Sequence, residues 1–164
     1  MDREFDPIAL AHQAGRLLAE RGWTLATAES CTGGLIGHWI TEVAGSSGYF
    51  VGGTVAYADD AKVRLLGVAA DLIREHGAVS EPVALAMAQG ARQALGAQVA
   101  VSVTGIAGPG GARDSKPVGT VYIGISSPLG ERVERDVWPH DRSGNKEASA
   151  RRALEMVIEM LGAN

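Results

Sequence analysis

The sequence predicts an α/β fold, in which helices cover both faces of a mixed β-sheet and form a three-layer α/β/α sandwich. Strand-like and helical segments alternate through most of the 164-residue chain, which is the pattern of such folds. Two consecutive strand-like segments then predict an antiparallel hairpin. Apolar residues make up 46% of the chain and aromatic residues only 5%, so we expect a core of Ala, Val, Leu and Ile.

The first helix is predicted from its start and stop signals. Asp6 and Pro7 are typical of the N-cap and first position of a helix, and apolar residues then recur near helical spacing until Gly22. The elements predicted up to residue 57 are this helix, a strand at 23–28, a helix at 33–45, a glycine-rich connector at 46–53 and a strand at 54–57.

The rest of the chain repeats this alternation and ends on a helix. Asp59 and Asp60 favour a helix start, because carboxylates oppose the positive end of the helix dipole. The near-continuous apolar run at 99–104 predicts a buried strand. The other predicted elements are helices at 59–67, 69–76, 80–95 and 148–161, strands at 116–126 and 131–138, and loops at 105–111 and 140–144.

Length and charge limit the class of protein. A chain of this length fits one domain, 1–164, because it buries roughly 70% of its unfolded surface. The formal charge of −4 argues against a nucleic-acid partner. The N-terminus has no apolar run, and no window approaches the ~20 apolar residues of a membrane span. We therefore expect a cytoplasmic protein without a membrane partner, and the single cysteine fits that reducing compartment.

The stretch 26–37 is the first candidate for chemistry. It reads as a strand that ends in a polar turn and restarts as a helix, which displays Ser30, Cys31 and Thr32 ahead of unpaired backbone amides. In the simpler interpretation, Ser30 or Thr32 caps the helix. Gly33 and Gly34 favour a functional role, because they allow close backbone approach and leave amides free to hold an oxyanion or a phosphate.

Cys31 is a competing nucleophile in the same turn, because a helix N-terminus can lower the pKa of a thiol. Its alternative role is a small, half-buried space filler. The four histidines fall in different predicted elements, and no C-x-x-C or H-x-x-x-H spacing occurs. The sequence therefore indicates neither a metal site nor a Cys–His pair.

Tyr57 and Lys62 flank the turn after the second predicted strand. A buried lysine with a lowered pKa could act as a general base toward a serine. However, Asp59 and Asp60 lie close to Lys62 in sequence and favour its charged form. On local physics alone, a solvated ion pair between Lys62 and Asp59 is the simpler interpretation.

The segment Thr104 to Gly111 is a glycine-rich loop that follows a strand. It matches neither G-x-G-x-x-G nor a Walker A motif, and the chain continues into a strand rather than a helix. Its backbone amides could still cradle an anion, with Arg113, Lys116 and Arg142 as candidate countercharges. A merely flexible loop is an equally good interpretation of this composition.

Several separate motifs occur in an order that identifies a family. They include AESCTGG at 28–34, TGIAGPGG at 104–111 and KPVGTV at 116–121. The chain closely resembles the CinA C-terminal domain family, whose members include bacterial nicotinamide-nucleotide amidases of the PncC type. The remaining matches are at 45–53, 55–57, 66–68, 79–81 and 141–142, together with Lys62.

The resemblance implies an activity and a set of site residues. The implied reaction is hydrolysis of the carboxamide of nicotinamide mononucleotide to nicotinate mononucleotide and ammonia, without a metal or other cofactor. Ser30 would be the nucleophile, Lys62 the base and Tyr57 a helper, and the family habit suggests a homodimer. We expect the amides of Thr32, Gly33 and Gly34 to stabilise the oxyanion. From charge and backbone we expect the loop Gly105 to Gly111 and Arg142 to hold the substrate phosphate. The predicted substrate-binding residues are Thr104, Gly105, Gly108, Gly111 and Arg142.

Some features depart from the family pattern. Ala58-Asp59 replaces a common Ser-Asn pair, and 143–146 occupies a segment where the family often has another basic residue. The molybdopterin-binding-like N-terminal domain of fused members is not in this sequence. Two alternatives to the serine amidase stay open: a non-catalytic nucleotide- or phosphate-binding regulatory module, and an amidase that uses the Cys31 thiol.

Overall fold

The computed structural model describes residues 4–113 and 115–162, and within these residues it contains a five-stranded mixed sheet. The strand order is β2-β1-β3-β4-β5. β1, β2 and β3 are parallel, whereas β4 runs antiparallel to both β3 and β5. The strands are β1 (Leu25–Glu29), β2 (Phe50–Val55), β3 (Val99–Gly105), β4 (Thr120–Ser127) and β5 (Gly130–Val137).

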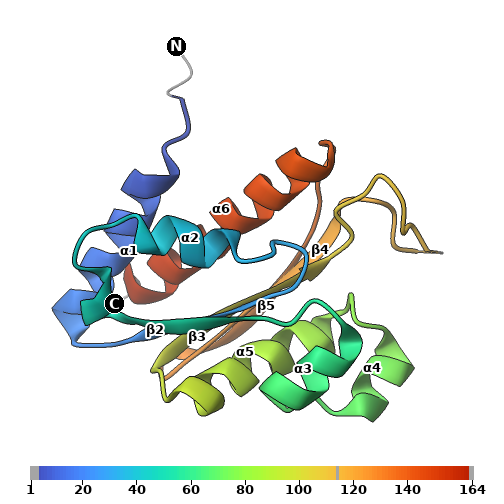
Figure 1. Ribbon diagram of the computed structural model, residues 1–164, viewed down its shortest axis with the longest axis horizontal. Helices are drawn as coiled ribbons and strands as arrows, with labels where there is room; N and C mark the ends of the chain where they lie inside the picture. The colour runs from blue at the N-terminus through green and yellow to red at the C-terminus, as the bar shows by residue number, and fades with distance from the viewer. Residues whose placement is uncertain (1–3, 114, 163–164) are drawn as a thin grey trace.

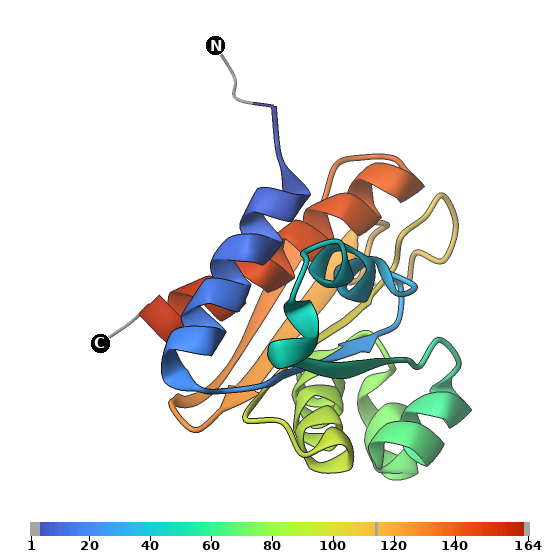
Figure 2. The same cartoon turned by 60° about the vertical axis from the view of Figure 1, so that its left-hand side comes forward.

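Helices cover both faces of this sheet, so the predicted three-layer α/β/α sandwich is confirmed (Figure 1). One outer layer contains α1 (Pro7–Arg21), α2 (Leu35–Thr41) and α6 (Arg142–Gly162). The other contains α3 (Asp59–Leu66), α4 (Ala70–His76) and α5 (Glu81–Leu95). Figure 2 shows the same separation from a second direction, with α1 and α6 packed side by side across the sheet from α5.

The two faces of the sheet carry side chains of different size. Val99, Val101 and Val103 join the larger apolar cluster with α1, α2 and α6, whereas Ala100 joins the smaller cluster with α3 and α5. Gly124 shows how closely α5 approaches this second face, because a Cβ there would lie 2.7 Å from the carbonyl oxygen of Ala84. Small residues on one face thus let α5 pack tightly against the strands.

The second strand differs from its prediction. Residues 46–53 were expected to be a connector, but a 3₁₀ turn (Ser46–Gly48) is followed directly by β2, which ends at Val55. The prediction was wrong because it took the glycines as residues of a connector, whereas Gly53 allows two strands to pack closely. A Cβ on Gly53 would clash with Oγ1 of Thr27 on the neighbouring strand.

Several other boundaries also differ, including both ends of the helix predicted at 33–45, which spans Leu35–Thr41. The first strand begins at Leu25 rather than at residue 23, and β4 begins at Thr120 rather than at 116. The last helix begins at Arg142 instead of 148, so the predicted polar loop at 140–144 is partly helical. Asp141 explains this early start, because its carboxylate accepts the N–H of Gly144 (2.8 Å) and caps the first turn.

The loops of the candidate site lie at one edge of the sheet. The carboxyl ends of the parallel strands β1, β2 and β3 meet there, and the chain enters α6 near the same edge (Figure 1). β1 is followed by a helix on one face and β2 by helices on the other, so the chain leaves these neighbouring strands in opposite directions. Open α/β sheets bind ligands at such a position.

Candidate active site

The turn after β1 presents Ser30 at the carboxyl edge of the sheet. The Ser30 N–H donates to the carbonyl of Val103 (2.9 Å), which extends the pairing of β1 with β3 by one residue. Gly33 and Gly34 follow with φ of 61° and 102°, a left-handed conformation that favours glycine. The chain can therefore reverse within four residues and leave Ser30 buried but in contact with a cavity.

The side chain that stabilises the start of α2 is Glu29, which sequence analysis did not identify. Its carboxylate is buried, with 2% exposure, and accepts the N–H groups of Ile36 (3.0 Å) and Gly37 (3.1 Å). The expected caps, Ser30 and Thr32, make no such bond within the described residues. The available signal was a charged residue at the end of an otherwise apolar strand, which is rare unless the charge has partners.

We expect Glu29→Gln to destabilise the fold. The amide loses the negative charge and turns an N–H₂ group toward a backbone donor, at a cost of about 1–3 kcal/mol in the free energy of unfolding. Urea unfolding followed by circular dichroism measures this cost. Glu42→Gln, the same change at an exposed position just after α2, is the control and should stay within about 0.5 kcal/mol of wild type. Equal stabilities of the two variants would contradict the capping role.

Lys62 reaches Ser30 from the first half of α3. Its Nζ lies 3.1 Å from Oγ of Ser30 and 3.1 Å from the main-chain carbonyl oxygen of Tyr57, to which it donates. The Ser30 hydroxyl is 3.5 Å from the same carbonyl. Lys62 is only 1% exposed, so this ammonium group is almost fully removed from water.

Burial controls the charge of Lys62. Desolvation lowers the pKa of this lysine, and the nearby carboxylate of Asp59 opposes that shift only partly. The Asp59 carboxylate lies 3.8 Å from Nζ and is mostly exposed, whereas Asp60 turns away and pairs with Arg64 (2.7 Å). The ion pair of Lys62 with Asp59 that local sequence predicts is therefore present, but it is not a solvated pair, because Nζ of Lys62 is buried and desolvation outweighs the acidic neighbour.

Cys31 lines the same cavity but is poorly suited to act as a nucleophile. Burial raises the pKa of its thiol to about 12, and the charge of Glu29 acts in the same direction. The reactive thiolate is therefore scarce near neutral pH. Ser30, which contacts Lys62, is therefore the better candidate nucleophile than Cys31.

The three amides expected to bind an oxyanion are not equivalent. The N–H of Gly33 already donates to the carbonyl of Ser30 (3.1 Å) within the turn. Among the described residues, no acceptor is found for the amides of Thr32 and Gly34. Two of the three expected donors are therefore unpaired, although none of the three residues is among those that line the two cavities described below.

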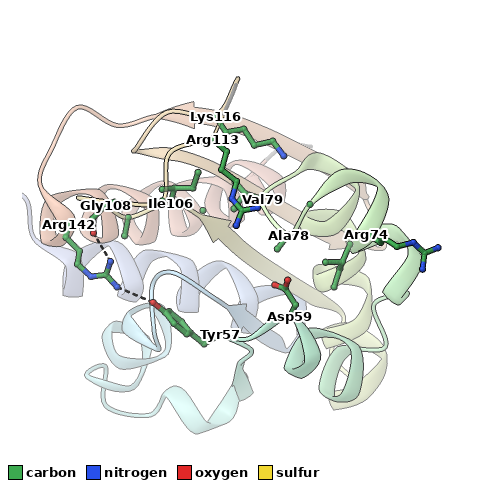
Figure 3. A pocket seen from close by; sticks show the side chains of 16 residues that line it. Tyr57, Asp59, Arg74, Ala78, Val79, Ile106, Gly108, Arg113, Lys116 and Arg142 are labelled. Atoms are coloured by element: carbon green, nitrogen blue, oxygen red, sulfur yellow. Dashed lines mark hydrogen bonds between the residues drawn. The ribbon is translucent and has the colours of Figure 1, made fainter.

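Two cavities meet at this edge. An inner cavity of about 200 Å³ is lined by Ser30, Cys31 and Lys62, and an outer cavity of about 480 Å³ is lined by the glycine-rich loop. Tyr57 and Gly105 line both, so the two spaces adjoin. Figure 3 shows the outer cavity, with Tyr57 and Asp59 on one side and the loop residues Ile106 and Gly108 on the other.

The loop residues predicted to bind substrate lie around these cavities. Gly105, Gly108 and Gly111 line the outer cavity, and Gly105 lines the inner one as well. Thr104 also lines the inner cavity, but its hydroxyl donates to the carbonyl of Ala78 (2.9 Å). Thr104 therefore links β3 to the segment before α5.

Arg142 lies where the two cavities adjoin and connects residues on opposite sides of that junction. Its guanidinium donates to the carbonyl of Gly108 (2.7 Å) and to the hydroxyl of Tyr57 (3.2 Å), as the dashed lines in Figure 3 mark. Asn145, one turn further along α6, donates to the carbonyl of Ala107 (3.0 Å). Sequence analysis missed Asn145, although it falls on the buried stripe of α6 with Ser149. Together these side chains attach the loop to α6.

The comparison with protein families agrees with this geometry. The family model described as CinA C-terminal domain matches residues 8–161. The chain belongs to the CinA C-terminal domain family. The expectation from the motifs at 28–34 and 104–111 is thereby confirmed.

Relatives of this CinA domain are similar to it in sequence and in fold. A CinA-like protein of Mycobacterium sp. (strain JLS) is 56% identical over 91% of the chain, and the chain spans only 35% of that relative's length. A crystal structure of a CinA superfamily protein from Klebsiella pneumoniae has a TM-score of 0.93 at 32% identity, covering 96% of this chain and 99% of that one. The competence/damage inducible protein CihA from Agrobacterium tumefaciens is 40% identical, with a TM-score of 0.91 and coverage of 98% and 99%.

Within residues 4–113 and 115–162, no cluster of three or more His, Cys, Asp or Glu side chains is arranged to hold a metal ion. In the same part of the chain, no helix combines the length and apolar character that a membrane span needs.

Proposed function

We propose that this CinA domain is a nicotinamide-nucleotide amidase, which hydrolyses the carboxamide of nicotinamide mononucleotide to nicotinate mononucleotide and ammonia. The observation that carries the proposal is the 3.1 Å contact between Lys62 Nζ and Ser30 Oγ at the wall of a cavity. A lysine whose pKa burial lowers is able to act as a base, and a serine within hydrogen-bond reach is the nucleophile it activates.

The proposed reaction proceeds through an acyl-enzyme. Neutral Lys62 takes the proton of the Ser30 hydroxyl as Oγ attacks the amide carbon, and a tetrahedral intermediate forms. The amides of Thr32 and Gly34 are the candidate donors to its oxyanion. Lys62 then protonates the leaving nitrogen, and ammonia departs. Water attacks the ester with Lys62 again as base, which releases the carboxylate and regenerates the Ser30 hydroxyl.

Tyr57 has two separate parts in this proposal. Its main-chain carbonyl accepts from Lys62 and so orients the amine toward Ser30. Tyr57 is 61% exposed and lines both cavities, which suits contact of its ring with the face of a pyridine ring. Arg142 holds the phenol by a hydrogen bond and thereby fixes the ring at the mouth of the inner cavity.

The size of the outer cavity supports a nucleotide rather than free nicotinamide. The carboxamide would reach Ser30 in the inner cavity, and the ribose 5′-phosphate would occupy the outer one, between the loop 105–111 and Arg142. Backbone amides and a guanidinium are both suited to phosphate.

The direct test is incubation of the purified chain with nicotinamide mononucleotide. We expect equimolar ammonia and nicotinate mononucleotide, measured by a coupled ammonia assay and by mass spectrometry, and little ammonia from free nicotinamide. Binding of the nucleotide without release of ammonia would contradict the amidase and favour a regulatory binding module.

A further inference from the structure

The outer cavity is distinctly cationic. Its lining contains four positively charged side chains and, among the described residues, one carboxylate, that of Asp59. Such an excess of one sign of charge raises the local concentration of an anionic ligand. The four cations are Arg74, Arg113, Lys116 and Arg142.

Three of these four cations already have partners. Arg74 forms an ion pair of 2.7 Å with Asp71, and Figure 3 shows its guanidinium directed away from the centre of the cavity. Lys116 donates to a main-chain carbonyl at the end of α4 (3.0 Å). Arg142 is held by its bonds to the loop and to the Tyr57 phenol. Each of the three therefore has part of its donor capacity committed to a partner within the protein.

Arg113 differs from them in direction and in partners. Figure 3 shows its side chain extending from the loop toward the centre of the cavity. Among residues 4–113 and 115–162, its guanidinium has neither a hydrogen bond nor an ion pair. Its main chain is fixed, because its N–H donates to the carbonyl of Lys116 (2.9 Å) and its carbonyl accepts from the N–H of Lys116 (2.5 Å). The loop thus holds the backbone in place and aims the cationic group into the cavity.

We propose that Arg113 binds the 5′-phosphate of the pyridine nucleotide and sets the preference for phosphorylated substrates; this inference rests on the proposed amidase function. A guanidinium offers two parallel N–H groups that match two phosphate oxygens. Arg142, which lies at the junction of the cavities, then acts mainly by positioning Tyr57 and Gly108. The phosphate contact comes from a side chain of the loop itself.

The test compares two substrates that differ only by the phosphate. For Arg113→Gln, we expect KM for nicotinamide mononucleotide to rise about tenfold or more, the loss that follows removal of a charge-assisted bidentate contact. kcat should change little, and kcat/KM for nicotinamide riboside should stay at the wild-type value. Arg74→Gln is the matched control, because it removes an arginine from the same lining whose guanidinium points away, and it should leave KM for both substrates unchanged.

Two results would overturn the inference while the amidase function stands. One is an unchanged KM for the mononucleotide in Arg113→Gln, and the other is an equal rise for the mononucleotide and the riboside. A binding measurement separates the two proposals. If the wild type releases no ammonia but calorimetry shows that it binds nicotinate mononucleotide, with binding weakened in Arg113→Gln and not in Arg74→Gln, the amidase proposal fails and the phosphate site stands.

Discussion

Ser30→Ala is expected to abolish the release of ammonia from nicotinamide mononucleotide, lowering kcat by a factor of about 10³ or more. The Ser30 hydroxyl is the one that faces Lys62 Nζ in the inner cavity, so its removal leaves no oxygen nucleophile in contact with the base. The loss should appear in kcat, whereas calorimetric binding of nicotinate mononucleotide should persist. A coupled ammonia assay and calorimetry measure the two quantities.

Cys31→Ala is the matched control, because it removes the adjacent side chain of the same cavity. The pKa of about 12 for this buried thiol makes its thiolate rare at neutral pH, so the variant should keep most of the wild-type kcat. An active Ser30→Ala together with an inactive Cys31→Ala would instead identify a thiol amidase.

Lys62→Met should lower kcat by about 10²–10⁴, the usual contribution of a general base. The variant is expected to fold, because methionine replaces a buried charge with an uncharged side chain of similar length. Its melting temperature near neutral pH should be no lower than that of wild type. Wild-type kcat in this variant would contradict the role of Lys62 as the base.

The pH dependence follows from the lowered pKa of Lys62. In the proposed mechanism the neutral amine is the base, so kcat/KM should rise with pH, with a midpoint below the 10.5 of an ordinary lysine. The same shift affects stability. At a pH between the lowered pKa of Lys62 in the folded protein and its ordinary pKa in the unfolded chain, the lysine is protonated only in the unfolded chain. The free energy of unfolding should therefore rise with pH across that window. Lys62→Met should lose this dependence.

Asp59 and Asp60 offer a matched pair for the pH profile. The Asp59 charge raises the pKa of Lys62, so Asp59→Asn should move the rising limb about 0.2–0.7 pH units toward acid, the size expected for a pair whose carboxylate is exposed to water. Asp60 pairs with Arg64 instead, and Asp60→Asn should leave the limb in place. Equal shifts in the two variants would mean that general surface charge, and not this contact, sets the pKa of Lys62.

The alternation of strands and helices was sufficient to predict the layers, but glycine was ambiguous. In β2, Gly53 serves the close approach of Thr27, whereas Gly33 and Gly34 form the turn that their positive φ values require. Sequence spacing cannot separate these two uses of glycine, because one depends on a neighbouring strand and the other on local backbone conformation. The start of α6 was missed for a related reason, since Asp141 is a cap in a segment that reads as polar loop.

Sequence was sufficient to predict that some of the residues of the candidate site lie near one another, but not the electrostatics of the site. Residues that follow parallel strands meet at one edge of a sheet, so the sequence alone is enough to group Ser30, Tyr57 and Gly105. The burial of Lys62 depends on how α3 packs against the sheet, and local sequence suggested the opposite protonation preference. The contact of Arg142 with Tyr57 joins residues 85 positions apart, and no spacing rule predicts it.

The acceptor that orients Lys62 is a main-chain atom, the carbonyl oxygen of Tyr57. Because every amino acid supplies this atom, the contact between Lys62 and Ser30 does not depend on the side chain at position 57. The exposed ring, by contrast, forms part of the wall that a substrate meets. Under the proposed amidase function, position 57 is therefore a point where evolution or protein engineering can vary which amides are accepted without changing the Ser30–Lys62 pair proposed to cleave them.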